Sequence, residues 1–155
     1  MPVIESSLVY VFQDDEVLML HRVKKKNDIH EGKWNGLGGK SERGESPAEC
    51  AIREVKEESN LDVHKVHFAG HITFPYFDGT NDWSVFIFTA DDFSGDIEDC
   101  DEGNLHWVKV KDMMSKNLWP GDRQFLPLVL DKKLFSGKIS YENGELVKCD
   151  LQTVD

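Results

Sequence analysis

The sequence contains little cysteine and no long apolar run. Its three cysteines, Cys50, Cys100 and Cys149, are widely spaced and form no CxxC pair. An odd, scattered set of this kind argues against a disulfide framework and against a zinc site. No stretch approaches the roughly 18 consecutive apolar residues of a membrane span, and the first five residues lack the features of a signal peptide. We therefore expect a soluble cytoplasmic protein without membrane contact.

Basic residues are also scarce. The chain has 18 Lys and Arg against 29 Asp and Glu, which gives a net charge of -11. Binding along a nucleic-acid backbone relies on clustered Lys and Arg, so DNA is not an expected partner. The six histidines show no zinc-binding spacing. If the ligand is a polyanion, metal ions must offset the carboxylates of the protein.

The 155 residues contain no repeat, low-complexity tract or linker, so we expect one domain spanning residues 1–155. Segments rich in β-branched and aromatic residues predict strands at 7–12, 17–22, 66–74, 83–90, 105–110, 135–141 and 146–153. The polar turn 13–16 and the Asn143-Gly144 turn predict hairpins. Residues 24–28 resemble a basic surface loop. The expected fold class is α+β, a mixed β-sheet sandwiched between two principal helices.

The first helix is predicted to begin at Pro47. Ser46 is a preferred N-cap, proline suits the first helical position, and Glu49 stands at the capping-box position. A second helix is expected over residues 121–133, where Pro127 favours a break or a late start.

The first helix separates an apolar face from an acidic one. At about 100° per residue, small and aliphatic residues share one arc, and Glu54, Glu57 and Glu58 share another. Like charges three and four positions apart destabilise a helix by a few tenths of a kcal/mol per pair. An acidic face often only solvates a helix, but three glycines nearby, Gly36, Gly38 and Gly39, can expose main-chain carbonyls. Such oxygen ligands suit Mg²⁺, with Mn²⁺ as the alternative.

Residues 39–61 resemble the signature of the Nudix (MutT-like) pyrophosphohydrolases. The matching positions are Gly39, Glu45, Arg53, Glu54, Val55, Glu57, Glu58 and Leu61. The single departure is Asn60, where the family pattern has glycine. Asparagine is the next most tolerant residue of a left-handed helix end, so this departure concerns helix termination.

The resemblance implies a water-dependent cleavage of a nucleoside diphosphate derivative with Mg²⁺. It implies that Glu54, Glu57 and Glu58 bind metal together with the carbonyl of Gly38. Arg53 is similar to the family's orienting residue. Beyond these, Glu45 would brace the loop before the helix, and Glu102 resembles an acid that serves in relatives as a further metal contact or base.

The region around Trp119 resembles the oxidised-purine nucleoside triphosphatases of this family, which convert 8-oxo-dGTP to the monophosphate and pyrophosphate. A purine needs a flat apolar slot and a few polar contacts, which Trp119, Asn35 and Asp122 can provide. Asp122 could donate a hydrogen bond only if burial raises its pKa. Gly121 departs from the two adjacent Asp residues of these relatives.

Lys40 and Arg22 are further substrate-binding candidates, because either cation could contact a phosphate. The leading hypothesis is a Mg²⁺-dependent hydrolase of 8-oxo-dGTP, a small-molecule nucleotide, with Glu54 and Glu102 both plausible as the base. Two alternatives stay open: hydrolysis of another diphosphate, such as a nucleotide sugar, a dinucleoside polyphosphate or an RNA 5′ end, and a non-catalytic nucleotide-binding module. The sequence is compatible with a monomer or a homodimer.

Overall fold

The computed structural model describes residues 2–24 and 30–155. Within these residues the strands are β1 (Val3–Gln13), β2 (Glu16–His21), β3 (Trp34–Asn35), β4 (Leu37–Lys40), β5 (Asp62–Phe74), β6 (Asp82–Ser94), β7 (Asn104–Lys109), β8 (Phe135–Glu142) and β9 (Glu145–Thr153). The helices are α1 (Pro47–Ser59), α2 (Asp122–Leu130) and a 3₁₀ helix (Val110–Ser115).

The strands form one mixed sheet in the order β3-β2-β1-β6-β5-β8-β9, with β4 added to β1 and β7 added to β2. The pairs β1–β6 and β5–β8 are parallel, and the others are antiparallel. The predicted hairpin of β1 and β2 is present, but the two strands pair only next to their turn. Beyond it, β1 continues between β4 and β6, whereas β2 pairs with β7.

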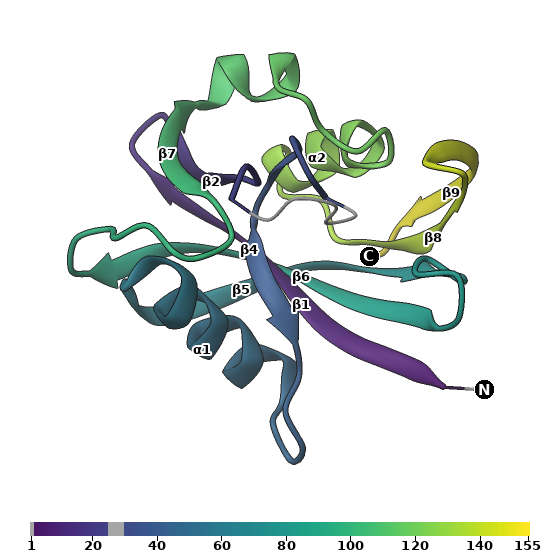
Figure 1. The fold of residues 1–155 in the computed structure, drawn as a ribbon, viewed down its shortest axis with the longest axis horizontal. Coiled ribbons are helices and arrows are strands. Elements are labelled where there is room, and N and C mark those ends of the chain that lie inside the picture. The colour runs from purple at the N-terminus through teal and green to yellow at the C-terminus, as the bar shows by residue number, and fades with distance from the viewer. Residues whose placement is uncertain (1, 25–29) are drawn as a thin grey trace.

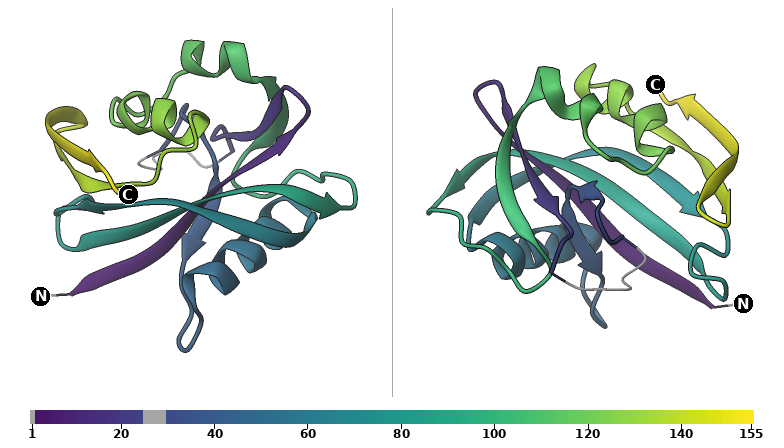
Figure 2. Two further views of the ribbon diagram at one scale, coloured as in Figure 1. Left: turned by 180° about the vertical axis from the view of Figure 1, so that it is seen from behind. Right: turned by 45° about the horizontal axis from the view of Figure 1, so that its top comes forward.

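Two apolar cores lie on opposite faces of the sheet. Because strand side chains alternate between faces, Val9 and Val11 pack into the core beneath α1, whereas Tyr10 packs into the core shared with α2. Figures 1 and 2 show α1 and α2 on opposite sides of the sheet. The expected sheet between two helices is confirmed.

Helix α1 has the ends that its sequence predicts. The Oγ of Ser46 accepts a hydrogen bond from the Glu49 N–H at 3.1 Å, and Glu49 Oε1 accepts from the Ser46 N–H at 2.8 Å. At the other end, Asn60 adopts the left-handed conformation with φ of 70°. The replacement of glycine by asparagine therefore leaves the helix stop intact.

Helix α2 is shorter than predicted. It begins at Asp122 and ends at Leu130, so the expected extension to residue 133 is wrong. Pro127 lies inside the helix without breaking it, because proline removes only its own N–H while its carbonyl still accepts from Asp131 at 3.0 Å. Lys132 then takes a positive φ of 56°, which ends the helical path before β8.

Five strands, β1, β5, β6, β8 and β9, extend their predicted ranges, whereas β2 and β7 begin and end one residue earlier than predicted. The final turn has positive φ at both Asn143 and Gly144, as a type I′ hairpin requires. Strands β3 and β4 and the 3₁₀ helix had not been predicted. Residues 25–28 of the expected basic loop lie outside the described residues. Among those described, no helix is long and apolar enough to cross a membrane.

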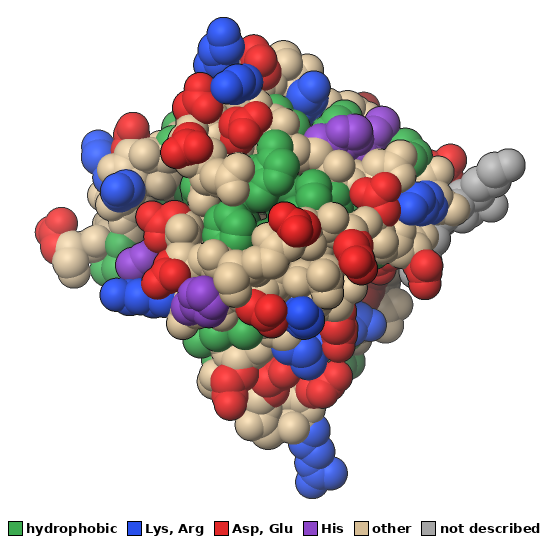
Figure 3. All heavy atoms as spheres, turned by 90° about the vertical axis from the view of Figure 1, so that its left-hand side faces the viewer, with side chains coloured by type: hydrophobic (Ala, Val, Ile, Leu, Met, Phe, Trp, Pro, Cys, Tyr) green, Lys and Arg blue, Asp and Glu red, His purple; other side chains and the backbone are tan. Residues whose placement is uncertain are grey.

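The visible surface carries many acidic groups. Figure 3 shows Asp and Glu side chains distributed over one face, around a small apolar patch. This agrees with the net charge of -11.

Candidate active site

A cavity of about 870 Å³ is lined by residues of β1, β4, α1, β6, α2 and β8 and of the segments that connect them. Its lining includes every residue that the sequence analysis selected for the site: Arg22, Asn35, Gly38, Lys40, Arg53, Glu54, Glu57, Glu58, Glu102, Trp119 and Asp122. Acidic and basic groups from α1 and β4 form one end of this cavity, the acid end. Trp119, Asp122 and several further aromatic residues form the other, which we call the aromatic end. A single cavity thus joins two chemically different regions.

The acid end depends on the close approach of α1 to β4. A Cβ atom on Gly39 would lie 2.6 Å from the carboxyl carbon of Glu54, so any side chain there would displace that acid. On the next turn, Glu58 Oε1 accepts a hydrogen bond from the Gly38 N–H at 2.7 Å. The glycines therefore allow two glutamates to lie directly against the strand.

Arg53 connects the acids of this end. Its Nε and Nη2 donate to the two carboxylate oxygens of Glu45 at 2.7 and 2.9 Å, and its Nη1 donates to Glu54 and Glu57 at 2.9 and 3.1 Å. Its Nη2 also donates to the Lys40 carbonyl at 3.0 Å. The Arg53 hydrogen bond lowers the pKa of Glu45 to about 2. One guanidinium therefore links the loop before α1 to the acidic face of the helix.

The carboxylates nearest the strand carry negative charge that is only partly balanced. Burial raises the pKa of Glu54; Arg53 opposes this shift, and Glu57 and Glu102 add to it. Burial also raises the pKa of Glu58 well above its ordinary value, opposed by the Gly38 N–H and increased by the neighbouring Glu102. Acids in this situation are stabilised in their charged form by an added cation.

The donor set fits a hard divalent cation, because carboxylate and carbonyl oxygens are the ligands that such ions prefer. In the described part of the chain, however, no three acid, histidine or cysteine side chains are already gathered closely enough to hold a metal ion. Arg53 here binds both Glu54 and Glu57. The Glu57 side chain is 56% exposed, so it can turn toward a cation with little disturbance of packing.

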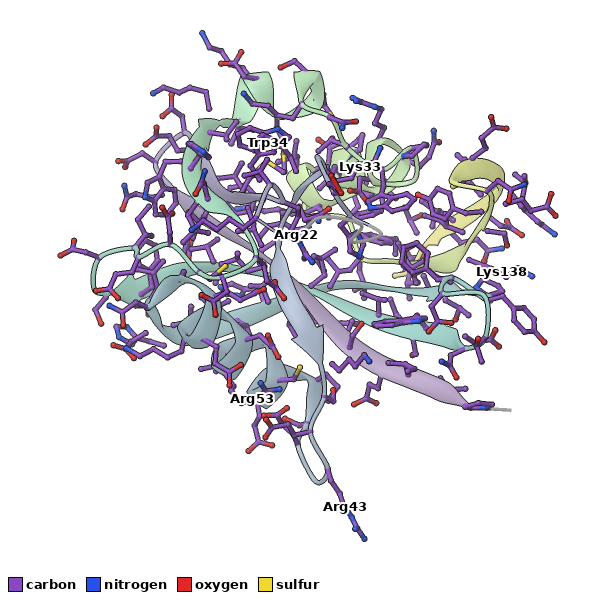
Figure 4. All side chains as sticks on the ribbon, viewed as in Figure 1. Arg22, Lys33, Trp34, Arg43, Arg53 and Lys138 are labelled. Carbon is purple, nitrogen blue, oxygen red and sulfur yellow. The ribbon has the colours of Figure 1, made fainter. Side chains whose placement is uncertain are left out.

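Arg22 and Lys40 lie beside the acids. Arg22 Nη1 is 3.5 Å from Glu102 Oε2, which joins the end of β2 to the loop before β7. Lys40 Nζ lies 5.5 Å from the centre of the Trp83 ring. Figure 4 shows Arg22 near the middle of the molecule, whereas Arg43 points away from it at the tip of the loop before α1. Arg22 and Lys40 therefore border the cavity together with Arg53, whereas Arg43 is not among its lining residues.

Trp119 is held among aromatic rings at the other end. Its ring meets those of His30, Phe77 and Tyr141 at steep angles, with centroids 5.2–5.5 Å apart. The indole Nε1 donates to His30 Nδ1 at 2.7 Å. The ring is thereby fixed at one wall of the cavity.

Asp122, at the first position of α2, has a carboxyl group enclosed by protein although the residue keeps some exposed surface. Burial raises the pKa of Asp122 to about 7, against the opposing effects of the Trp119 backbone, Lys33 and Arg123. The carboxyl can therefore exist in either protonation state near neutral pH. In its protonated form Asp122 can donate a hydrogen bond to a ligand in the cavity.

Sequence reasoning missed three lining residues of the aromatic end. His30 was noted only as one of six histidines without zinc-binding spacing, but it lines the cavity and accepts the Trp119 hydrogen bond. Tyr10 and Tyr141 also line it, and Phe77 joins Trp83 on its wall. Tyrosine in a strand is an ordinary core residue, so no local pattern distinguishes Tyr10 or Tyr141. Only the pairing of distant strands brings them to Trp119.

Cys50 is a buried residue of α1, as expected for a small apolar thiol. Its Sγ donates to the Gly39 carbonyl at 3.4 Å. Burial raises the pKa of Cys50, which favours the protonated thiol over the reactive thiolate.

Comparisons with known proteins agree with this geometry. The NUDIX domain family matches residues 3–129. The mouse oxidized purine nucleoside triphosphate hydrolase is 35% identical over 150 residues, covering 96% of this chain and 94% of its own length. The zebrafish (Danio rerio) protein of the same name is 35% identical, covering 91% of this chain and 88% of its own.

Among solved structures, the MutT protein from Bacillus halodurans superposes with a TM-score of 0.85 at 27% identity. That match covers 96% of this chain and 97% of the other. The match of the family over most of the chain, together with these relatives, shows that the protein belongs to the Nudix family.

Proposed function

We propose that this Nudix protein hydrolyses purine nucleoside triphosphates with an oxidised base, with 8-oxo-dGTP as the favoured substrate, in the cytoplasmic nucleotide pool. The products are the monophosphate and pyrophosphate. The observation that carries the proposal is the continuity of the 870 Å³ cavity, which joins an acid end suited to phosphates to an aromatic end suited to a purine. The mouse and zebrafish relatives bear the name of this activity.

Glu54, Glu57 and Glu58, with the carbonyl of Gly38, would hold the metal ion, for which we propose Mg²⁺, with Mn²⁺ as a substitute. When bound, such an ion neutralises phosphate charge and lowers the pKa of a coordinated water. Arg53 is a positioning residue, because its hydrogen bonds hold Glu54 and Glu57 at fixed places on the helix. Glu45 fixes Arg53 from the other side.

The proton of the attacking water would pass to a carboxylate at the acid end. Glu54 and Glu102 both line the cavity and both remain candidates for this step. Arg22 and Lys40 would bind the phosphate chain, since each is a cation at the cavity wall. Because Arg22 also pairs with Glu102, substrate binding and the position of that acid are coupled.

The purine would lie at the aromatic end. Trp119 offers an indole face for stacking, and base–aromatic stacking contributes about 1–3 kcal/mol per base. Asn35 offers an amide to the base edge, and Asp122 offers a carboxyl that accepts when ionised and donates when protonated.

We also propose that residues 1–155 act as one domain. The family match ends at residue 129, yet Phe135 and Ile139 of β8 are buried in the same core as Phe125 of α2. The last hairpin thus belongs to the core that supports the cavity.

The test is a panel of nucleotides with chromatographic detection of all products, pyrophosphate and nucleoside monophosphates included, run with Mg²⁺, with Mn²⁺ and with a chelator. We expect 8-oxo-dGTP to be turned over faster than dGTP or ADP-ribose, and the chelator to abolish turnover. If ADP-ribose or a dinucleoside polyphosphate were preferred, the substrate assignment would be wrong while the metal-dependent chemistry stood. Tight nucleotide binding without hydrolysis would instead identify a non-catalytic module.

A further inference from the structure

The main chain at Gly121 is in contact with a tyrosine hydroxyl. The Gly121 N–H donates to Tyr141 Oη at 2.7 Å. A Cβ atom on residue 121 would lie 2.5 Å from that oxygen and 2.9 Å from Ile139 Cγ2. The phenol therefore occupies the space that any side chain at position 121 would need.

Tyr141 projects from β8 into the aromatic end of the cavity. Its ring lies at 64° to that of Trp119 and at 66° to that of Phe77, with centroids 5.2 and 5.9 Å away. It lines the cavity together with Asp122. These contacts fix the direction of the ring, so its hydroxyl has a defined position beside the proposed base site.

The hydroxyl has a proton available for a ligand. Its oxygen accepts from the Gly121 N–H, and among residues 2–24 and 30–155 no acceptor for the Tyr141 O–H is found. Burial raises the pKa of Tyr141, and the negative charge of Asp122 raises it further. The phenol consequently stays protonated and acts as a donor at neutral pH.

We propose that Tyr141 is a specificity-determining residue that donates a hydrogen bond to the C6 carbonyl oxygen of a guanine-type base. This rests on the proposed function and deepens it. The adjacent Asp122, when ionised, accepts the N1–H of the same edge. A donor and an acceptor side by side match the carbonyl and ring N–H of a 6-oxopurine. The Tyr141 hydroxyl would thus make the hydrogen bond to the base that Gly121, having no side chain, cannot make.

The rival explanation is that Tyr141 only supports the backbone at Gly121. A supporting hydroxyl would change stability and would affect all substrates equally. A hydroxyl that contacts the base would affect only substrates that carry an acceptor at C6. The substrate dependence of the loss therefore separates the two roles.

The wild-type protein is assayed on 8-oxo-dGTP before any variant is made, and failure there would refute the proposed function itself. The first test then compares kcat/KM of the wild type and of Tyr141→Phe on three nucleotides: 8-oxo-dGTP, dGTP and 2-aminopurine deoxyribonucleoside triphosphate, which lacks the C6 oxygen. We expect Tyr141→Phe to lose about 5- to 10-fold on 8-oxo-dGTP and dGTP, the value of one neutral hydrogen bond. Turnover of the 2-aminopurine nucleotide should change less than about 2-fold on the same reasoning.

Tyr76→Phe is the matched control, because Tyr76 is 55% exposed and is not part of the cavity lining. Thermal melting of both variants reports any loss of folding. If the wild type hydrolyses 8-oxo-dGTP but Tyr141→Phe loses equally on all three nucleotides, or on none, the inference is overturned while the proposed function stands.

The second test uses Gly121→Ala, alone and with Tyr141→Phe. The added methyl group displaces the hydroxyl, so the single variant should lower the preference for dGTP over the 2-aminopurine nucleotide by the same factor of about 5 to 10 as Tyr141→Phe. The part of that preference that comes from the N1–H and Asp122 should remain. In the Tyr141→Phe background the same change should leave that ratio unaltered, because the contact is already gone. Independent effects of the two substitutions on the ratio would overturn the inference.

Discussion

At its acid end the cavity draws mainly on one short stretch of chain, residues 38–58, whereas its aromatic end draws on β1, β3, β6, α2 and β8. Three of its acids, Glu54, Glu57 and Glu58, lie within four positions of one another on α1. By contrast, Asn35, Trp119 and Tyr141 meet only when the sheet is complete. The arrangement of the acids is determined by the local sequence, whereas the arrangement of the aromatic end depends on tertiary structure.

We therefore expect the acid end to determine the rate of hydrolysis and the aromatic end to determine which base is accepted. A change on α1 alters how charge is held at the phosphates and leaves the base site in place. A change at Trp119, Asp122 or Tyr141 alters which base fits and leaves the acids in place. The following substitutions test that separation, from the largest expected effect to the smallest.

Glu57→Gln should lower kcat by about 10²- to 10³-fold, the typical effect of removing one group that stabilises transition-state charge. The amide is the same size and the side chain is 56% exposed, so the fold should remain. Steady-state kinetics at saturating Mg²⁺ measures the loss, and circular dichroism monitors the fold. Glu145→Gln on the exposed end of β9 is the control. Full turnover by Glu57→Gln would show that the acid end is not the reaction centre.

Trp119→Ala should weaken nucleotide binding by about 1–3 kcal/mol through lost stacking. The effect should appear mainly in KM, with kcat changing much less, if the two ends act separately. Titration of a non-hydrolysed nucleotide analogue measures the affinity directly. Trp107→Ala removes a tryptophan outside the cavity and serves as the control. A fall in kcat as large as that of Glu57→Gln would contradict the separation.

Asp122→Asn should change the pH dependence of stability. The carboxyl has a pKa of about 7 in the folded chain against 3.8 for an ordinary Asp, so folding takes up a proton between about pH 4 and pH 7. The contribution of this group to the free energy of unfolding therefore falls as pH rises through that window, by about 1.4 kcal/mol per pH unit and so by roughly 3 kcal/mol between pH 5 and pH 8.

In Asp122→Asn this fall should be absent, whereas the exposed Asp131→Asn should retain it. Urea unfolding at pH 5 and pH 8 compares the variants. A wild type and an Asp122→Asn protein with parallel pH profiles would show that Asp122 titrates normally.

Asn60→Gly should have the smallest effect. Asn60 has φ of 70°, a conformation that glycine adopts without a Cβ penalty, so the substitution should stabilise the protein by about 0.5 kcal/mol. Turnover should be unchanged, because residue 60 lies outside the cavity lining. A clear change in kcat would show that helix termination influences the acids two residues earlier.

The acid end and much of the fold were predictable because their signals are local. Ser46, Pro47 and Glu49 determine where α1 begins, and Asn143-Gly144 determines the last turn. Every residue chosen for the site from the sequence lines the cavity. Their chemical roles stay predictions.

What the sequence did not reveal depends on contacts between distant segments. Strand β4 is rich in glycine and forms because it pairs with β1, a partner outside any local window. His30 and Tyr141 acquire their places only from Trp119 and from the parallel pairing of β5 with β8. Gly121 was recognised as a departure, but its meaning required the position of the Tyr141 hydroxyl.

The parallel pairing of β1 with β6 also has a consequence for folding. It joins residues 3–11 to residues 82–90, and β5 with β8 joins residues 70–73 to residues 135–138. Helix α1, with its own caps, can begin to form as soon as it is synthesised, whereas pairings this distant are slow to close. During synthesis β1 cannot pair with β6 until residue 90 has been made, and Tyr141 is the last of the cavity-lining residues to be synthesised. A refolding chain should therefore regain its helical signal before it regains hydrolysis.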